Sequence, residues 1–114
     1  MADGAVYINI EEGLKRVVNN AGLYVRLLVK FKDDKNLNEL ETALAAGDLE
    51  KAQTYAHTLK GLSANLSLIE LQKQSLEVES QIKLGSVKPD QITIMKNVYT
   101  QTLVEIEKVI AKYG

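Results

Sequence analysis

Apolar residues recur at intervals of three and four along nearly the whole chain, and no stretch shows the alternation typical of a half-buried strand. This spacing gathers apolar side chains on one face of an α-helix. It predicts a short helix over roughly 9–19 and longer helices over roughly 22–46, 48–66, 68–84 and 89–113. Because the connections are short, we expect an all-α fold: an antiparallel four-helix bundle, up-down-up-down, with the additional N-terminal helix closing one end.

Residues that commonly cap helices mark several of these boundaries. Asn9 can accept hydrogen bonds from the first amides of the short helix, with Glu12 as its capping-box partner three positions later. Gly47 followed by Asp48 indicates a helix end and then a helix start. Pro89 suits the first turn of the last helix. Backbone chemistry and periodicity therefore agree on where these helices begin and end.

The middle of the segment 22–46 is polar. Asp33, Asp34, Lys35 and Asn36 interrupt its apolar stripe, and they can form either a solvated turn of one long helix or a break between two. We expect one continuous helix here. Consecutive carboxylates on a helix point about 100° apart, so the two aspartates do not predict a metal site.

Composition narrows the class of protein. A chain of 114 residues is expected to form one domain, 1–114. It has no cysteine and one histidine, which argues against disulfides, thiol catalysis and the usual zinc sites. A net charge of −1 gives no basic excess for a nucleic acid, and no apolar run approaches the roughly 20 residues of a membrane span. We therefore expect a cytoplasmic protein that binds neither nucleic acid nor membrane, and no signal peptide is evident.

The single histidine, His57, is the main candidate for chemistry. It lies roughly 130° from the apolar seam of its helix, which averages close to Leu59, so it is predicted to face solvent. Gly61 follows one turn later, although a glycine inside a helix costs about 0.8–1 kcal/mol relative to alanine. Its missing side chain would let another protein's backbone approach the imidazole. Lys60 can bring an ammonium group to an anion carried by that ring.

A neutral imidazole on the surface is a nucleophile that can accept a phosphoryl group. Lys60 could then stabilise the negative charge that the ring acquires. His57 and Glu79 lie equally far in sequence from Leu68, where the predicted hairpin between two helices turns. They should therefore reach the same height, so that Glu79 can accept a hydrogen bond from the imidazole and fix its tautomer.

Each of these residues also has a simpler interpretation. A lone surface histidine is inert in most proteins, and a surface lysine is usually only solvated. Gly61 can be a packing glycine at a point where another helix crosses closely. The combination of His57, Lys60 and Gly61 favours a functional site over these alternatives.

The stretch AHTLKGLSANL, residues 56–66, resembles the signature of histidine-containing phosphotransfer (HPt) domains, the carriers of multistep phosphorelays. It contains the histidine, a lysine at +3, a glycine at +4 and a small residue at +7. Ser67 departs from the family pattern, which commonly has glycine at +10. The similarity covers most of the chain and extends upstream through Gly13–Leu14, Tyr24, Leu27–Leu28, Phe31 and Leu44–Leu49.

The resemblance implies a role for each residue of the site. His57 would be the phosphoacceptor and Lys60 would support the phosphoryl group, while Glu79 stands where the family often has Gln or Glu. The domain would be a phosphocarrier without ATP-dependent kinase activity of its own, and the chain contains no Gly-rich phosphate loop or kinase motif. It would need no cofactor, because Mg²⁺ would be supplied by the receiver partner.

The resemblance also implies partners: response-regulator receiver domains and a hybrid sensor kinase, bound by a monomer. Gly61 and Ala64 would form a low-profile docking surface, and we expect Gln53 and Asn65 on the same side to contribute to it. The predicted reaction is phosphoryl transfer from a receiver aspartate to His57 and on to another receiver. Two alternatives stay open, namely a module of a larger hybrid or chemotaxis-type sensor kinase, and a helical adaptor bundle without chemistry.

Overall fold

The structure, a computed structural model, describes residues 6–114, and within them it contains helices and no strands. The predicted all-α class is therefore confirmed. The helices are α1 (Ile10–Arg16), α2 (Ala21–Phe31), α3 (Asn36–Ala45), α4 (Leu49–Asn65), α5 (Ile69–Lys83) and α6 (Pro89–Tyr113).

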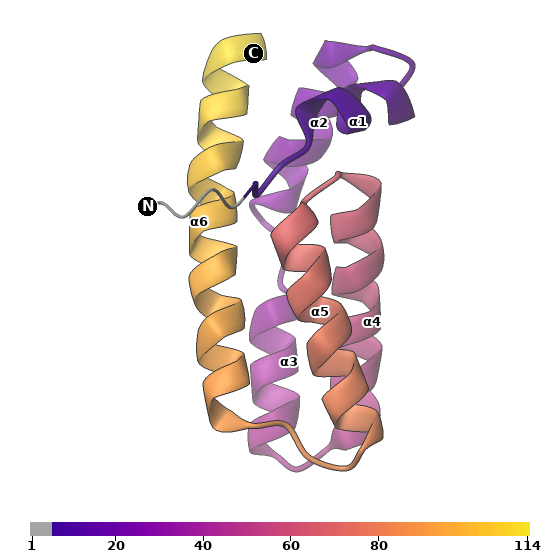
Figure 1. The fold of residues 1–114 in the computed structure, drawn as a ribbon, viewed down its shortest axis with the longest axis vertical. Coiled ribbons are helices and arrows are strands. Elements are labelled where there is room, and N and C mark those ends of the chain that lie inside the picture. Colours follow the sequence, from indigo (N-terminus) through magenta and orange to yellow (C-terminus); the bar gives the residue numbers. More distant parts are fainter. Residues whose placement is uncertain (1–5) are drawn as a thin grey trace.

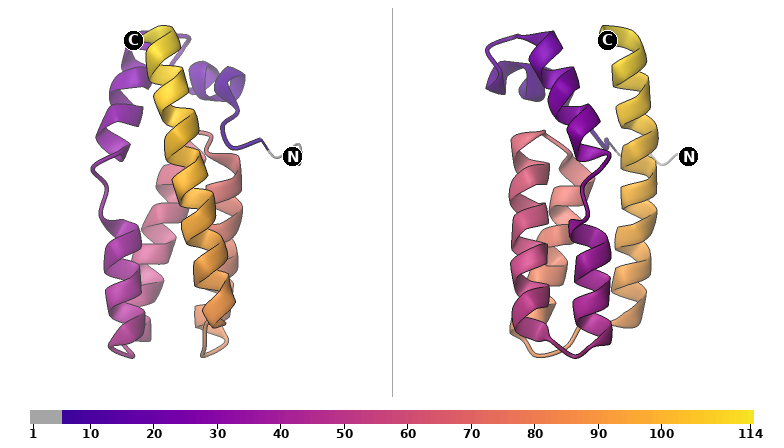
Figure 2. Two further views of the ribbon diagram at one scale, coloured as in Figure 1. Left: turned by 90° about the vertical axis from the view of Figure 1, so that its left-hand side faces the viewer. Right: turned by 180° about the vertical axis from the view of Figure 1, so that it is seen from behind.

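At one end of the molecule, the lower end in Figure 1, the core is surrounded by α3, α4, α5 and the first half of α6. α3 continues in the direction of α2, whereas α4, α5 and α6 each turn back on the helix before them. The second half of α6 continues past this group and packs against α2, while α1 lies against α2 at the same end (Figure 2). Within residues 6–114, no helix is both long and apolar enough to cross a bilayer.

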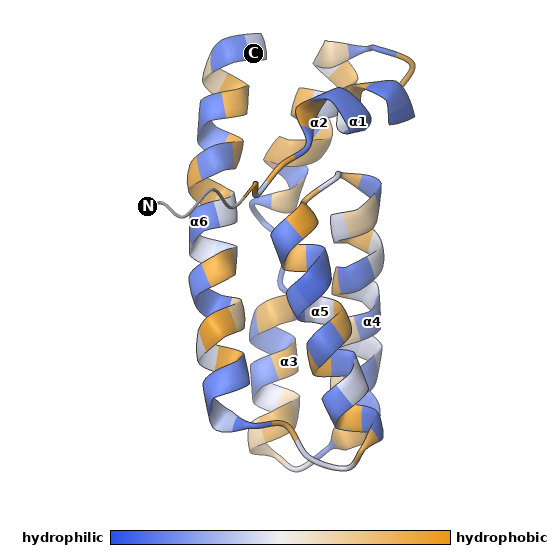
Figure 3. Ribbon diagram, in the orientation of Figure 1, coloured by the Kyte–Doolittle hydropathy of each residue, from blue (hydrophilic) through white to orange (hydrophobic). Residues whose placement is uncertain are grey.

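Apolar residues recur along the helices (Figure 3), and those of the core are buried in the interior. The buried residues of α4 and α5 include the small residues Ala52, Ala56, Ser63 and Ser75, which let the two helices pack closely. Ser63 and Ser75 satisfy their hydroxyls within their own helices, donating to the carbonyls of Leu59 at 2.7 Å and Leu71 at 2.8 Å. The largest fully buried aliphatic side chains are Leu28, Leu40, Leu59, Leu68, Leu71, Met95 and Ile106.

The prediction of one continuous helix over 22–46 is wrong. α2 ends at Phe31 and α3 begins at Asn36. Asp34 explains the break, because its carboxylate accepts the backbone N–H of Asn36 at 3.0 Å and the side-chain amide of the same residue at 2.7 Å. Such local bonds offer the backbone an alternative to the helical ladder. The polar residues that interrupted the apolar stripe therefore form a true linker.

α1 is shorter than the predicted span of 9–19, and its capping box is only half formed. Asn9 accepts the backbone N–H of Glu12 at 3.1 Å, as expected. The Glu12 carboxylate does not return the bond but accepts the hydroxyl of Ser67 at 2.9 Å. The backbone N–H of Asn9 donates instead to the Ser67 carbonyl, also at 2.9 Å. The N-terminal segment is thereby joined to the turn between α4 and α5.

Ser67 lets that turn form without the glycine that the family commonly has there. Its φ of 58° lies in the left-handed region, which is costly for a residue with a side chain. Ser67 is fully buried, and its hydroxyl is the group bound by Glu12. The backbone N–H of Leu68 donates to the Ser63 carbonyl at 2.8 Å and closes the end of α4. The hairpin that sets the heights of α4 and α5 is thus held from two directions.

The turn after α1 contains a strained residue whose replacement should stabilise the protein. Val18 has a φ of 53°, and the residue is 88% exposed. We expect Val18→Asn to raise the free energy of unfolding by about 1 kcal/mol, because asparagine tolerates this conformation better than a β-branched residue does. Urea denaturation measures the change. Val29→Asn, at an exposed helical position of α2, should give no such gain, and an equal gain in both variants would contradict the explanation.

Candidate functional site

His57 lies near the middle of α4, on the face opposite to the core. Its neighbours Ala56 and Leu59 are fully buried, and they fix the rotation of the helix. The side chain of His57 is 68% exposed, which confirms that it faces solvent.

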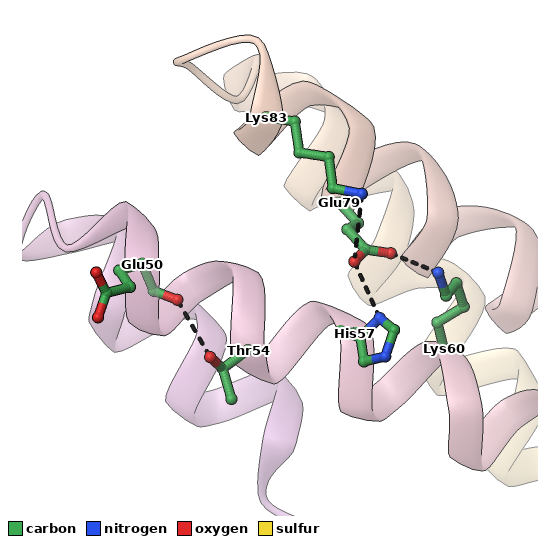
Figure 4. A network of polar contacts seen from close by, with 6 residues as sticks. All are labelled: Glu50, Thr54, His57, Lys60, Glu79 and Lys83. Carbon is green, nitrogen blue, oxygen red and sulfur yellow. Dashed lines mark hydrogen bonds and ion pairs between the residues drawn. The ribbon is translucent and has the colours of Figure 1, made fainter.

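Glu79 of α5 lies directly opposite His57. The Nδ1 atom of the imidazole is 3.0 Å from Oε2 of Glu79, so the hairpin brings the two residues to the same height as predicted (Figure 4). An ionised carboxylate can only accept a hydrogen bond, which requires the proton to be on Nδ1. The lone pair is then on Nε2, on the side of the ring away from Glu79.

The Glu79 carboxylate is buried, with its side chain 4% exposed, and two lysines lie near its oxygens. Nζ of Lys60 is 2.6 Å from Oε1, and Nζ of Lys83 is 3.9 Å from Oε2. Burial acts to raise the pKa of Glu79. The hydrogen bonds from Lys60 and His57, together with the charges of both lysines, outweigh burial and hold this pKa below its ordinary value. Glu79 is therefore anionic at neutral pH.

Lys60 is tied to Glu79 in this structure. From the sequence we expected Lys60 one helical turn from His57, as a partner for an anion on the ring. It does lie one turn further along α4, and its side chain is 27% exposed. We did not predict its bond to Glu79, and we missed Lys83 altogether. A signal for Lys83 was present, because it follows Glu79 by four positions and so shares its face of α5.

Gly61 borders open space. A Cβ atom built on Gly61 would meet no atom within 4 Å, apart from its own helix backbone, so the alternative of a packing glycine at a helix crossing is wrong. Ala64, one turn further along α4, is half-buried. The surface after His57 on this helix is therefore low and accessible.

Gln53 and Asn65, the other two residues predicted to contact a partner, border separate depressions on either side of His57. Gln53 borders an open depression of about 530 Å³ that reaches His57, Glu79 and Lys83. Asn65, which is exposed, borders a groove of about 550 Å³ between the end of α4 and the linker after α2. The polar and apolar walls of that groove include Leu27, Phe31, Asp34, Lys35 and Leu62.

Within the part of the chain that the structure describes, no three His, Cys, Asp or Glu side chains are grouped so that they could hold a metal ion. What the site offers is an exposed ring nitrogen, a buried anion that orients the ring, and two lysines.

Comparison with known proteins gives one match. The family model described as the Hpt domain matches residues 27–108, a span that includes α3, α4 and α5 and omits α1. No curated protein and no solved structure matches the chain. Since the matched span is well over half of the sequence and contains both His57 and Glu79, the chain belongs to the Hpt domain family, whose members are phosphocarrier modules of two-component signalling.

Proposed function

We propose that this chain is a phosphocarrier of a multistep phosphorelay, in which His57 accepts a phosphoryl group from a receiver aspartate and passes it to another receiver. The observation that carries the proposal is the hydrogen bond of Nδ1 to a buried carboxylate, which leaves the Nε2 lone pair pointing to solvent. We take α3–α6 to be the up-down-up-down bundle that holds this pair in place. Because the proposed partners are receiver domains, we place the exchange in the cytoplasm.

The proposed transfer begins with attack of the Nε2 lone pair on the phosphorus atom of an aspartyl phosphate. The P–O bond to the aspartate breaks, and its electron pair leaves with the carboxylate. The ring now carries a positive charge, because Nδ1 keeps its proton. The anionic Glu79 at 3.0 Å stabilises that charge. A cationic ring is also a good leaving group, so the same contact supports transfer onward to the next receiver.

Lys60 is proposed to support the phosphoryl group. It lies one helical turn from His57 and is partly exposed, so its ammonium can turn from Glu79 toward an anion on Nε2. A receiver would supply Mg²⁺ and the acidic residues that hold it, leaving this chain to contribute a positioned nucleophile and a cation. No cofactor of its own is part of the proposal.

Docking is proposed to use the low surface around Gly61. Gly61 and Ala64 present little side chain, while Gln53 and Asn65 border the depressions on either side of His57. A receiver that covers this surface would exclude water from the reacting atoms. It would thereby strengthen the interaction of Glu79 with the imidazole ring and that of Lys60 with the phosphoryl group.

Replacing Gly61 should separate docking from folding. We expect Gly61→Gln to weaken receiver binding by at least about tenfold, because the added side chain stands between the partners. It should not destabilise the bundle, since the position is open and glutamine is a better helix former than glycine. Gly61→Ala is the matched control: it should raise the free energy of unfolding by about 0.8 kcal/mol and affect binding far less. Calorimetry measures the affinity for the receiver, and urea denaturation measures the free energy of unfolding. Unchanged affinity in Gly61→Gln would exclude Gly61 from the interface.

The proposal is tested directly by incubating the protein with a panel of phosphorylated receivers and Mg²⁺. We expect acid-labile phosphate to appear on this chain with at least one receiver, and to leave it when a second, unphosphorylated receiver is added. Binding without any transfer across the panel would support the adaptor interpretation instead.

A further inference from the structure

The two oxygens of Glu79 face different lysines. Lys60, from α4, is hydrogen-bonded to Oε1 at 2.6 Å. Lys83, the last residue of α5, is 3.9 Å from Oε2, which is near enough for an ion pair and too far for a hydrogen bond. Its side chain is 59% exposed and borders the same depression as His57. In the resting state Lys60 is thus the close partner and Lys83 the distant one (Figure 4).

Transfer of Lys60 to a phosphoryl group would leave Glu79 without its close partner. A buried carboxylate that lacks a cation is costly and tends to take up a proton. A protonated Glu79 would no longer stabilise the positive charge that the ring acquires. A second cation that approaches Glu79 when Lys60 departs, before the ring has become positive, would prevent this protonation.

We propose that Lys83 is this exchange counterion: it closes on Oε2 of Glu79 as Lys60 leaves, and so keeps the carboxylate ionised and His57 protonated at Nδ1. The departure of Lys60 rests on the proposed function. Lys83 would be a positioning residue, since it acts through Glu79 and not on the phosphoryl group. With Lys83 included, the charges of the carboxylate, the cationic ring, the two lysines and a dianionic phosphoryl group cancel, whereas without it one negative charge is left over.

The first test needs no phosphoryl donor, because Lys60→Met imitates the departure of Lys60. The ¹⁵N chemical shifts of the imidazole report which nitrogen of His57 carries the proton. We expect the Nδ1–H form to persist in Lys60→Met and in Lys83→Met, since either lysine suffices, and to be lost in the double variant. Lys83→Arg should preserve it in the Lys60→Met background. Lys73→Met in that background is the matched control, because Lys73 also lies on α5 but pairs with Glu70.

Two outcomes would overturn the assignment. One is loss of the Nδ1–H form in Lys60→Met alone, and the other is its persistence in the double variant. If the double variant does not fold, the same pair of lysine replacements is made in Glu79→Gln, where no carboxylate needs a counterion. That protein should fold, and failure to fold there would assign the lysines a role unrelated to Glu79.

The second test measures phosphorylation. At equilibrium with a phosphorylated receiver, Lys83→Met should hold about threefold less phosphohistidine than the wild type, the size expected for one exposed ion pair. In the Glu79→Gln background the same replacement should have no effect, and an equal effect in both backgrounds would show that Lys83 does not act through Glu79. Wild-type protein that accepts no phosphate at all would refute the proposed function, while the ¹⁵N result would still decide whether Lys83 is the counterion.

Discussion

His57→Gln is expected to abolish phosphoryl acceptance and leave the bundle folded. Glutamine has no nucleophilic nitrogen, so no covalent intermediate can form. Its side-chain amide can still donate a hydrogen bond to Glu79, and the position is exposed, so the free energy of unfolding should change by no more than about 0.5 kcal/mol. Transfer of labelled phosphate from a receiver, together with urea denaturation, measures both effects.

A matched control distinguishes the site from general damage. Thr100→Gln introduces the same side chain at an exposed position of α6 and should accept phosphate at the wild-type rate. Acceptance by His57→Gln at that rate would show that another residue is the acceptor. Unfolding of His57→Gln would contradict the view that His57 contributes little to stability.

Glu79→Gln is expected to slow phosphoryl transfer by about 10- to 100-fold. The amide can still accept a hydrogen bond from Nδ1, but it has no charge with which to stabilise the cationic ring or hold the two lysines. Single-turnover measurements with one receiver give the rate. Transfer at the wild-type rate would show that the charge of Glu79 is not required.

The same variant should change how stability depends on pH. The pKa of Glu79 is lowered in the folded protein. Its ionised form therefore stabilises the fold fully at any pH above the pKa that Glu79 has in the unfolded chain. That contribution is lost as the pH falls through the lowered pKa of the folded state. Glu79→Gln lacks it throughout. Urea denaturation from neutral to acid pH should therefore show the wild type losing more stability than Glu79→Gln, and parallel losses would contradict this account.

Most of the fold follows from local features of the sequence, and the errors occur where a side chain has two possible partners. Periodicity located α4, α5 and α6 because their apolar seams are continuous. It also ran across the linker between α2 and α3, where apolar residues resume at helical spacing but Asp34 binds Asn36 in place of a helical turn. The partner of Glu12 was missed for a similar reason, since Ser67 is distant in sequence and competes with the local capping bond.

In the site, too, the features that depend on one helix or one hairpin could be predicted, and those that depend on burial could not. The exposure of His57 follows from the seam of one helix, and its contact with Glu79 follows from the symmetry of one hairpin. The positions of Lys60 and Lys83 depend on a buried negative charge, and a helical wheel does not show how deeply Glu79 lies. Once the carboxylate is known to be both buried and ionised, electrostatics favours cations near its oxygens, and Lys60 and Lys83 are found there.

The central claim is that Glu79 holds the proton on Nδ1 and leaves Nε2 of His57 as the reacting atom. The most direct test is ³¹P and ¹⁵N NMR of the protein after phosphorylation by a receiver, because P–N coupling identifies the nitrogen that carries the phosphoryl group. We predict a single phosphohistidine, bonded through Nε2. A phosphoryl group on Nδ1, or phosphate on any other residue, would contradict the account.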